Sequence, residues 1–275
     1  MPNPMEPLRL ISLNVERGHH VELVKKFLQE QQPDIICLQE VCPENVPEFA
    51  QIMHASATRY SPTTIQIETT RQHVEQGIAI ISRLPVIATV VQPYIGDAAL
   101  IPVTDIAQVE TYNNSNRAVI AIEVAKGTQQ FRVCTTHFTW SPKGQATDEQ
   151  RRTMSKLLGI LSTLQPLVLC GDFNAPRISD GKPGEIFEML TSQYKDNIPP
   201  HYETSIDISL HRDGKVAAES LSHIMADGLF TTPQYQVNNV RLVPGVSDHM
   251  AVIADITSTL LKEPALASAP GSAVV

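Results

Sequence analysis

Acidic, amide and imidazole side chains recur in this chain at the ends of apolar segments. The segment "LVLCGDFNAP", residues 167–176, runs through apolar residues and ends on Asp172 and Asn174. A short apolar run bounded by Gly and Pro is typical of a buried strand. Five other strand-like segments carry such residues at or beside one end: Asn14 with Glu16, Glu40, His137, Asp227, and Asp248 with His249.

Each of these residues has a structural explanation when it is taken alone, because turns, strand caps and buried hydrogen bonds use the same side chains. Taken together they indicate a site, since strand ends at one edge of an α/β fold converge on one crevice. Carboxylate and amide oxygens without thiolates suit a hard divalent cation such as Mg²⁺. Two histidines with a further aspartate suit phosphate contact and proton transfer. The set therefore indicates metal-assisted hydrolysis of a phosphoester.

The segments that must position these residues predict a mixture of strands and amphipathic helices. Residues 20–31 predict a helix that Pro33 ends, with the apolar face Val21, Val24, Phe27 and Leu28. Residues 147–164 predict a second helix, opened by a capping box from Thr147 to Gln150. Early strands alternate with helices and later ones form hairpins, which favours mixed sheets with outer helices. We expect one domain over residues 8–258, a loose N-terminus (1–7) and a disordered tail (259–275).

The composition is that of an ordinary globular domain, with 275 residues, 42% hydrophobic and 18% charged. A net charge of −8 argues against a protein that binds nucleic acid through charge alone. No apolar run reaches the roughly 20 residues that span a bilayer, and no secretory signal is evident. The four cysteines, which lack metal or disulfide spacing, are Cys37, Cys42, Cys134 and Cys170. We expect a cytoplasmic monomer with reduced thiols and no transmembrane segment.

Six motifs, in order, resemble the endonuclease/exonuclease/phosphatase superfamily: "ISLNVERG", "IICLQEV", "GIAIISRLPV", "TTHF", "GDFNA" and "SDHMAV". They extend over nearly the whole chain, from about residue 8 to residue 256. The resemblance implies the α/β fold of pancreatic-type deoxyribonucleases. This fold is a four-layer sandwich, with two mixed β-sheets packed face to face and helices on the outside. It also implies a Mg²⁺- or Mn²⁺-dependent phosphoesterase, in which an activated water attacks the phosphorus in line.

The same resemblance implies roles for residues on the metal side of the site. Glu40 matches the principal metal ligand and Asn14 lies beside it. Asp248 falls in the metal region, and Glu16 falls where some members place a second acid. Asp172 matches the residue that orients or deprotonates the attacking water.

The remaining roles concern the phosphate. Asn174 matches the residue that holds the water and the phosphate, and His249 matches a phosphate-facing histidine oriented by Asp227. His137 resembles a second histidine on the phosphate side. Two further residues match positions seen only in some branches. These are an acid expected to orient His137 and an arginine expected to contact phosphate: Glu75 and Arg117.

The motifs leave the substrate open. Ala175 stands where inositol-polyphosphate phosphatases usually have arginine, and "NVERGH" stands where abasic-site endonucleases typically have "NVNGLR". A stand-alone phosphodiesterase or phosphatase fits the sequence best, and a nuclease acting on DNA or RNA is the alternative. A non-catalytic binding module on the same fold is the alternative of another class, and the presence of Glu40 and His249 argues against it.

Overall fold

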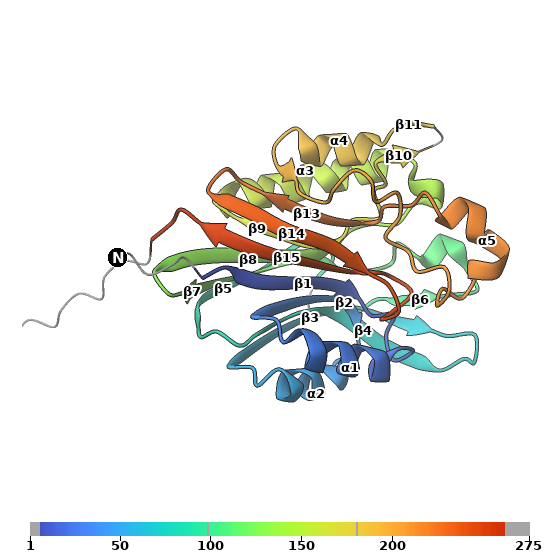
Figure 1. The fold of residues 1–275 in the computed structure, drawn as a ribbon. Helices are drawn as coiled ribbons and strands as arrows, with labels where there is room; N and C mark the ends of the chain where they lie inside the picture. Colours follow the sequence, from blue (N-terminus) through green and yellow to red (C-terminus); the bar gives the residue numbers. More distant parts are fainter. Residues whose placement is uncertain (1–5, 98, 180, 262–275) are drawn as a thin grey trace, which may run out of the picture.

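The computed structural model describes residues 6–97, 99–179 and 181–261, and two large β-sheets dominate it (Figure 1). The first sheet has the strand order β14-β15-β1-β2-β4-β3-β6. Strands β1 and β2 are parallel, as are β3 and β6, and the other neighbours are antiparallel. The bounds are β1 Leu8–Asn14, β2 Ile35–Val41, β3 Ala57–Ile67, β4 His73–Ser82, β6 Val103–Asp105, β14 Tyr235–Val243 and β15 Ala251–Ser258.

The second sheet has the order β12-β13-β9-β8-β7-β5, with β8 and β9 parallel and the other pairs antiparallel. A small hairpin, β10 (Ile178–Ser179) with β11 (Lys182–Pro183), lies outside both sheets. The bounds in the second sheet are β5 Val86–Ile95, β7 Arg117–Lys126, β8 Gln129–His137, β9 Val168–Asp172, β12 Lys195–Asp196 and β13 Asp227–Thr231.

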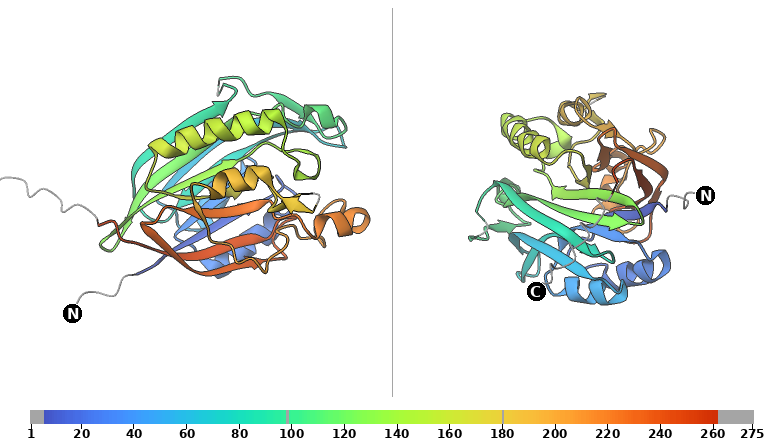
Figure 2. Two further views of the ribbon diagram at one scale, coloured as in Figure 1. Left: turned by 90° about the horizontal axis from the view of Figure 1, so that it is seen from above. Right: turned by 90° about the vertical axis from the view of Figure 1, so that its left-hand side faces the viewer.

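Helices cover the outer face of each sheet (Figures 1 and 2). Helices α1 (Val21–Gln31) and α2 (Asn45–Ile52) pack on the first sheet, and α3 (Asp148–Thr163) and α4 (Glu185–Thr191) pack on the second. A third apolar core, formed by side chains such as Leu10, Ile80, Ile122 and Val168, fills the space between the sheets. The predicted four-layer sandwich is therefore confirmed. The remaining helical segments are α5 (Gly214–Leu221), η1 (Val109–Thr111) and η2 (Pro142–Gly144).

Both predicted helices are present at the predicted positions. Helix α1 buries Val24, Phe27 and Leu28 against the sheet. Helix α3 begins after Thr147, whose hydroxyl accepts the Gln150 backbone N–H, while the Gln150 side chain accepts the Thr147 N–H. This capping box satisfies donors that the first helical turn leaves without partners.

Strand β3 is the main element that the sequence pattern did not reveal. Its segment "ATRYSPTTIQI" is largely polar and contains Pro62, which removes a ladder hydrogen bond. The strand nevertheless pairs with β4 from Ala57 to Ile67, with an irregularity in register next to Pro62. Helices α2, α4 and α5 are each only two turns long, and their short apolar patterns carried no clear period.

The four cysteines are free and buried. Cys37 and Cys170 lie in the core between the sheets, and Cys134 lies in the core under α3. Cys42, which follows β2, is also buried, with 1% of its surface exposed. The prediction of four unpaired thiols is confirmed.

The expected loose ends of the chain fall mostly outside the described residues, namely 1–5 and 262–275. Residues 259–261 belong to the predicted disordered tail, but the Gln130 backbone N–H donates to the Leu260 carbonyl at 3.0 Å. Leu261 also bridges Gln129. The tail prediction is therefore wrong for these three residues. Among the helices that the structure describes, none has the length and apolar character to cross a membrane.

Candidate active site

Sheet register brings three of the predicted residues side by side. Strand β9 lies between β8 and β13, so Asp172 pairs with His137 on one side and with Asp227 on the other. Gly171 permits the close approach of β8 and β9 just before Asp172. Its φ is +148°, and a Cβ at this position would lie 2.0 Å from the Thr136 carbonyl oxygen. Glycine at this position therefore has a steric cause, and the acid that follows it is delivered to the shared edge.

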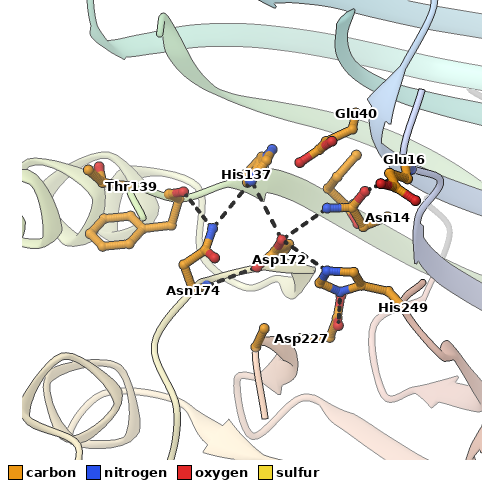
Figure 3. A network of polar contacts seen from close by, with 12 residues as sticks. Asn14, Glu16, Glu40, His137, Thr139, Asp172, Asn174, Asp227 and His249 are labelled. Carbon is orange, nitrogen blue, oxygen red and sulfur yellow. Dashed lines mark hydrogen bonds and ion pairs between the residues drawn. The ribbon is translucent and has the colours of Figure 1, made fainter. Parts of the chain in front are cut away.

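Asp172 is the centre of the polar network (Figure 3). Its Oδ2 accepts a hydrogen bond from Asn14 Nδ2 at 3.0 Å and lies 3.5 Å from His137 Nε2 and 3.9 Å from His249 Nε2. Its Oδ1 accepts the backbone N–H of Asn174 at 2.9 Å. Burial raises the pKa of Asp172 above its usual range, although the two histidines act in the opposite direction.

His249 forms the shortest contact in this network, with its Nδ1 at 2.7 Å from Asp227 Oδ2. The Asp227 side chain is fully buried, and its other oxygen has no hydrogen-bond partner within the described chain. Burial lowers the pKa of His249, but the Asp227 carboxylate outweighs it and holds that pKa well above the usual value. The sequence-predicted pairing is present, and the other ring nitrogen of His249, Nε2, faces Asp172.

The pKa of His137 is shifted in the opposite direction. Burial lowers the pKa of His137, and the attraction of Asp172 does not compensate for it. Its Nε2 lies 3.3 Å from Asn174 Nδ2, and its backbone carbonyl accepts a hydrogen bond from Arg117 at 3.1 Å. Two histidines on either side of one carboxylate thus have pKa values shifted in opposite directions, a pattern typical of acid–base sites.

Glu75 does not reach His137. Its carboxylate accepts a hydrogen bond from the Tyr60 hydroxyl at 3.2 Å, and the next residue, Gln76, faces the site instead. Successive side chains of a strand point to opposite faces, so Glu75 and Gln76 cannot both line the site. The expectation that Glu75 orients His137 is therefore wrong.

The acids expected on the metal side gather next to this network. Ligand atoms of Glu16, His20 and Asp248 all lie within 4.8 Å of one another. Burial raises the pKa of Glu16 to about 8, and Asp248 contributes in the same direction. The Asn14 side chain links the two halves of the site, because its Oδ1 accepts the Glu16 backbone N–H at 3.1 Å and its Nδ2 donates to Asp172.

Glu40 is held by an arginine that the sequence did not single out as a site residue. Arg17 forms ion pairs with Glu40 and, at 2.7 Å, with Glu68. Burial raises the pKa of Glu40, but Arg17, the two histidines of the site and the Asn14 side chain together outweigh it, so the net shift is downward. Carboxylate oxygens from Glu40, Glu16 and Asp248 fit a hard divalent cation such as Mg²⁺, and the His20 nitrogen also suits Mn²⁺.

Several of these residues have strained backbone conformations. The φ angles of Glu16, Arg17, Glu40 and Asn174 are +45°, +61°, +52° and +48°, a region that non-glycine residues rarely adopt. Such conformations persist where the surrounding structure enforces them, and they cluster at functional sites. In this protein they lie at or just beyond the ends of β1, β2 and β9.

A cavity of about 160 Å³ opens beside the network. Glu16, Glu40 and Asp248 line it, together with His137 and Arg117. Thus most of the predicted residues, but not Glu75, lie in one polar network or line the cavity beside it.

Comparisons with known proteins identify the fold. The model of the Endonuclease/Exonuclease/phosphatase family matches residues 11–249, which is most of the chain. The chain belongs to this family. Members of the endonuclease/exonuclease/phosphatase family include metal-dependent phosphoesterases and nucleases. A comparison with curated proteins found no match.

Solved structures of the endonuclease/exonuclease/phosphatase family are similar over nearly the whole chain. An endonuclease/exonuclease/phosphatase from Beutenbergia cavernae has a TM-score of 0.70 at 17% identity, covering 92% of this chain and 72% of that one. The human Nocturnin catalytic domain with bound sulfate has a TM-score of 0.62 at 18% identity, covering 92% and 94%. D. rerio TDP2, complexed with a single-strand DNA product, has a TM-score of 0.63 at 14% identity, covering 92% and 99%. At these identities the similarity establishes the fold.

Some residues of the site carried little or no signal in the sequence. Arg17 directly follows "NVE" in the first family motif, and His20 lies four residues after Glu16, a spacing that was the available clue. The His20 side chain meets Glu16, with 3.0 Å between His20 Nε2 and Glu16 Oε2. Glu68 and Arg212 come from distant connections, and only the tertiary fold brings them to the cavity or to Arg17.

Proposed function

We propose that this protein is a Mg²⁺- or Mn²⁺-dependent hydrolase of phosphodiesters or phosphomonoesters. The observation that carries the proposal is the position of Asp172, whose Oδ2 lies between a histidine of raised pKa, His249, and one of lowered pKa, His137. Phosphoester hydrolysis needs a base for the attacking water and a donor for the phosphoryl oxygens, and this arrangement contains both.

Each side chain then has one task. Asp172 accepts the proton of the attacking water, and a pKa raised by burial makes it a better base than an exposed aspartate. Asn174 holds the water and the phosphate through its amide. His249, kept protonated by Asp227, donates to a phosphoryl oxygen as negative charge develops there. Neutral His137 contacts the phosphate from the other side.

The acids beside this network would hold the cation. Glu16, Asp248 and Glu40 supply the carboxylate oxygens, and Asn14 positions the turn that carries Glu16. A divalent cation bound there supplies a Lewis acid that polarises the phosphoryl oxygen. Arg17 fixes the Glu40 carboxylate, so that this ligand is oriented before the substrate arrives.

A metal-supplemented turnover screen tests the proposal. The protein, stripped with EDTA, is assayed with Mg²⁺ or Mn²⁺ on bis(p-nitrophenyl) phosphate, p-nitrophenyl phosphate and single-stranded DNA. We expect turnover of at least one ester with metal and none in excess EDTA. Full activity in EDTA would contradict the metal requirement, and no turnover of any ester would favour the binding module.

A further inference from the structure

His20 lies beside the acids expected to hold the cation, and the family resemblance assigns it no role. Its Nε2 is 3.0 Å from Glu16 Oε2, and ligand atoms of Glu16, His20 and Asp248 all lie within 4.8 Å of one another. Carboxylates alone suit Mg²⁺, whereas an imidazole beside them adds a nitrogen donor that suits transition metals better. The metal preference of the site therefore depends on whether His20 is a ligand.

The turn between β1 and α1 carries His20 back to Glu16. Glu16 and Arg17 both have left-handed backbone, and the His19 backbone N–H donates to the Glu16 carbonyl at 3.2 Å. The Arg17 backbone N–H donates to the Glu40 carbonyl at 2.9 Å, which ties the turn to β2. Non-glycine residues keep such conformations where the surrounding structure enforces them. The fold thus holds His20 close to Glu16.

His20 does not serve the helix that it precedes. It occupies the N-cap position of α1, yet its side chain makes no capping hydrogen bond. Serine, threonine, asparagine and aspartate are favoured at this position, because their side chains accept free backbone N–H groups of the first turn. The His20 ring instead meets the Glu16 carboxylate, with 13% of the His20 side chain exposed. Helix capping therefore does not explain a histidine here.

Asp248 is a buried carboxylate without a cationic partner. The residue is 7% exposed and lines the cavity. Among the residues that the structure describes, its side chain accepts one hydrogen bond, from the Ser247 hydroxyl to Oδ1 at 3.1 Å, and forms no ion pair. Burying a carboxylate is costly unless a positive charge approaches it. This observation, which is independent of His20, indicates that a cation completes the group.

The third acid on the metal side already has a cationic partner. Arg17 forms an ion pair with Glu40, and its Nε lies 2.7 Å from a carboxylate oxygen of Glu68. Arg17 also lies 3.4 Å from Glu16 Oε1, on the oxygen that does not face His20. In the described part of the chain, Arg17 thus leaves Glu16 Oε2, Asp248 and the His20 ring as donors that no arginine engages.

We propose that His20 is a nitrogen ligand of the cation and that it makes the site select Mn²⁺ over Mg²⁺. This inference rests on the proposed function, in which Glu16, Asp248 and Glu40 supply the oxygen ligands. Imidazole and carboxylate together suit Mn²⁺, whereas Mg²⁺ prefers oxygen ligands and keeps several waters. His20 and Glu16 would then exchange their mutual hydrogen bond for bonds to the metal.

Metal binding in the absence of substrate tests the ligand directly. Pulsed EPR of the EDTA-stripped protein, reloaded with Mn²⁺, detects nitrogen nuclei bonded to the ion. We expect the wild type to show a directly bound nitrogen and His20→Gln to lose it, because an amide binds a hard cation through its oxygen. The matched control is His19→Gln, at a neighbouring histidine with 51% of its side chain exposed, which should keep the signal. A wild type without bound nitrogen, or a signal unchanged in His20→Gln, would overturn the inference.

Calorimetry with MnCl₂ and MgCl₂ measures the selectivity. The wild type should bind Mn²⁺ at least about tenfold more tightly than Mg²⁺. In His20→Gln the affinity for Mn²⁺ should fall at least about tenfold, while that for Mg²⁺ should change by less than about threefold. A histidine that only positions Glu16 would weaken both metals equally when replaced, and that outcome would contradict the ligand assignment. If His20→Gln does not fold, as judged by thermal melting, His20→Asn replaces it, since asparagine is favoured at an N-cap.

The two proposals fail in different ways. If the wild type turns over no ester but binds Mn²⁺ through a nitrogen that His20→Gln removes, the proposed function is wrong and the ligand assignment holds. If the wild type hydrolyses bis(p-nitrophenyl) phosphate but shows no bound nitrogen or no preference for Mn²⁺, only the ligand assignment is wrong.

Discussion

His249 and Asp227 form a buried pair in which Nδ1 of the imidazole lies 2.7 Å from a carboxylate oxygen. The pair comes from elements far apart in sequence, the start of β13 and the loop before β15. The loop is fixed by the Asp207 backbone N–H, which donates to the Asp248 carbonyl at 2.7 Å. The carboxylate sets which ring nitrogen carries the outward proton, so the pair acts as one unit.

Kinetics of a double-mutant cycle test this unit. His249→Ala should lower kcat by a factor on the order of 10² or more, because the donor acts mainly in the transition state. Asp227→Asn should lower kcat through the same histidine, and the double variant should be little worse than His249→Ala. Exposed His73 provides the control variant His73→Ala, which should retain parental kcat. Fully additive losses would show that the two residues act independently.

The same pair predicts a pH dependence of stability. The pKa of His249 is raised in the folded protein, so the pair's stabilisation is fully present below the ordinary value of 6.5 and disappears as pH rises through the folded pKa. Breaking such a buried pair costs on the order of 3 kcal/mol. Urea unfolding of metal-free wild type and Asp227→Asn should therefore differ most near pH 6 and converge as the pH rises through the raised pKa of His249. A difference that grows with pH would contradict the assignment.

Metal binding should release a proton from Glu16. With a pKa of about 8, this carboxyl is mostly protonated at pH 7, whereas a cation requires the carboxylate. Calorimetric titration with MnCl₂ in buffers of different ionisation enthalpy should show release of about one proton at pH 7 and tighter binding at pH 8. Glu16→Gln should abolish the release, and exposed Glu22→Gln should not. Proton-free binding by the wild type would exclude Glu16 as the titrating ligand.

Catalysis should not depend on the thiols. Burial raises the pKa of Cys42 to about 12 and raises that of Cys37 well above its usual value, so neither forms a reactive thiolate near neutral pH. Iodoacetamide at pH 7.5 should therefore modify the folded protein slowly, and turnover should persist. Rapid loss of turnover on alkylation, prevented by substrate, would indicate a thiol at the site.

The sequence predicted the parts of the site that depend on where strands end. Asp172, His137 and Asp227 each stand at the end of an apolar run, and sheet register then places them together. The sequence did not predict which of two neighbouring residues faces the site, because a shift of one residue in strand register exchanges them. Glu75 and Gln76 are neighbours, and pairing with β3, a strand hidden by its polar composition, turns Gln76 toward the cavity and Glu75 toward Tyr60.

Arg17 shows a second limit of the sequence. Its contact with Glu40 depends on left-handed backbone at Glu16, Arg17 and Glu40, which no local propensity predicts for these residues. The lining of the cavity likewise includes Thr104 of β6. This strand is three residues long and pairs in parallel with β3. Such features arise from tertiary packing and cannot be read from periodicity.

The turnover of Asp172→Asn tests the central claim most directly. With saturating Mg²⁺ or Mn²⁺ and bis(p-nitrophenyl) phosphate, or whichever ester the wild type accepts, we expect kcat to fall by at least about 10²-fold, because the amide cannot accept the proton of the attacking water. The control Asp148→Asn, at an exposed side chain in the first turn of α3, should keep parental kcat. Folding of both variants is checked by thermal melting. An Asp172→Asn variant that folds and retains kcat within about twofold of the wild type would contradict the account.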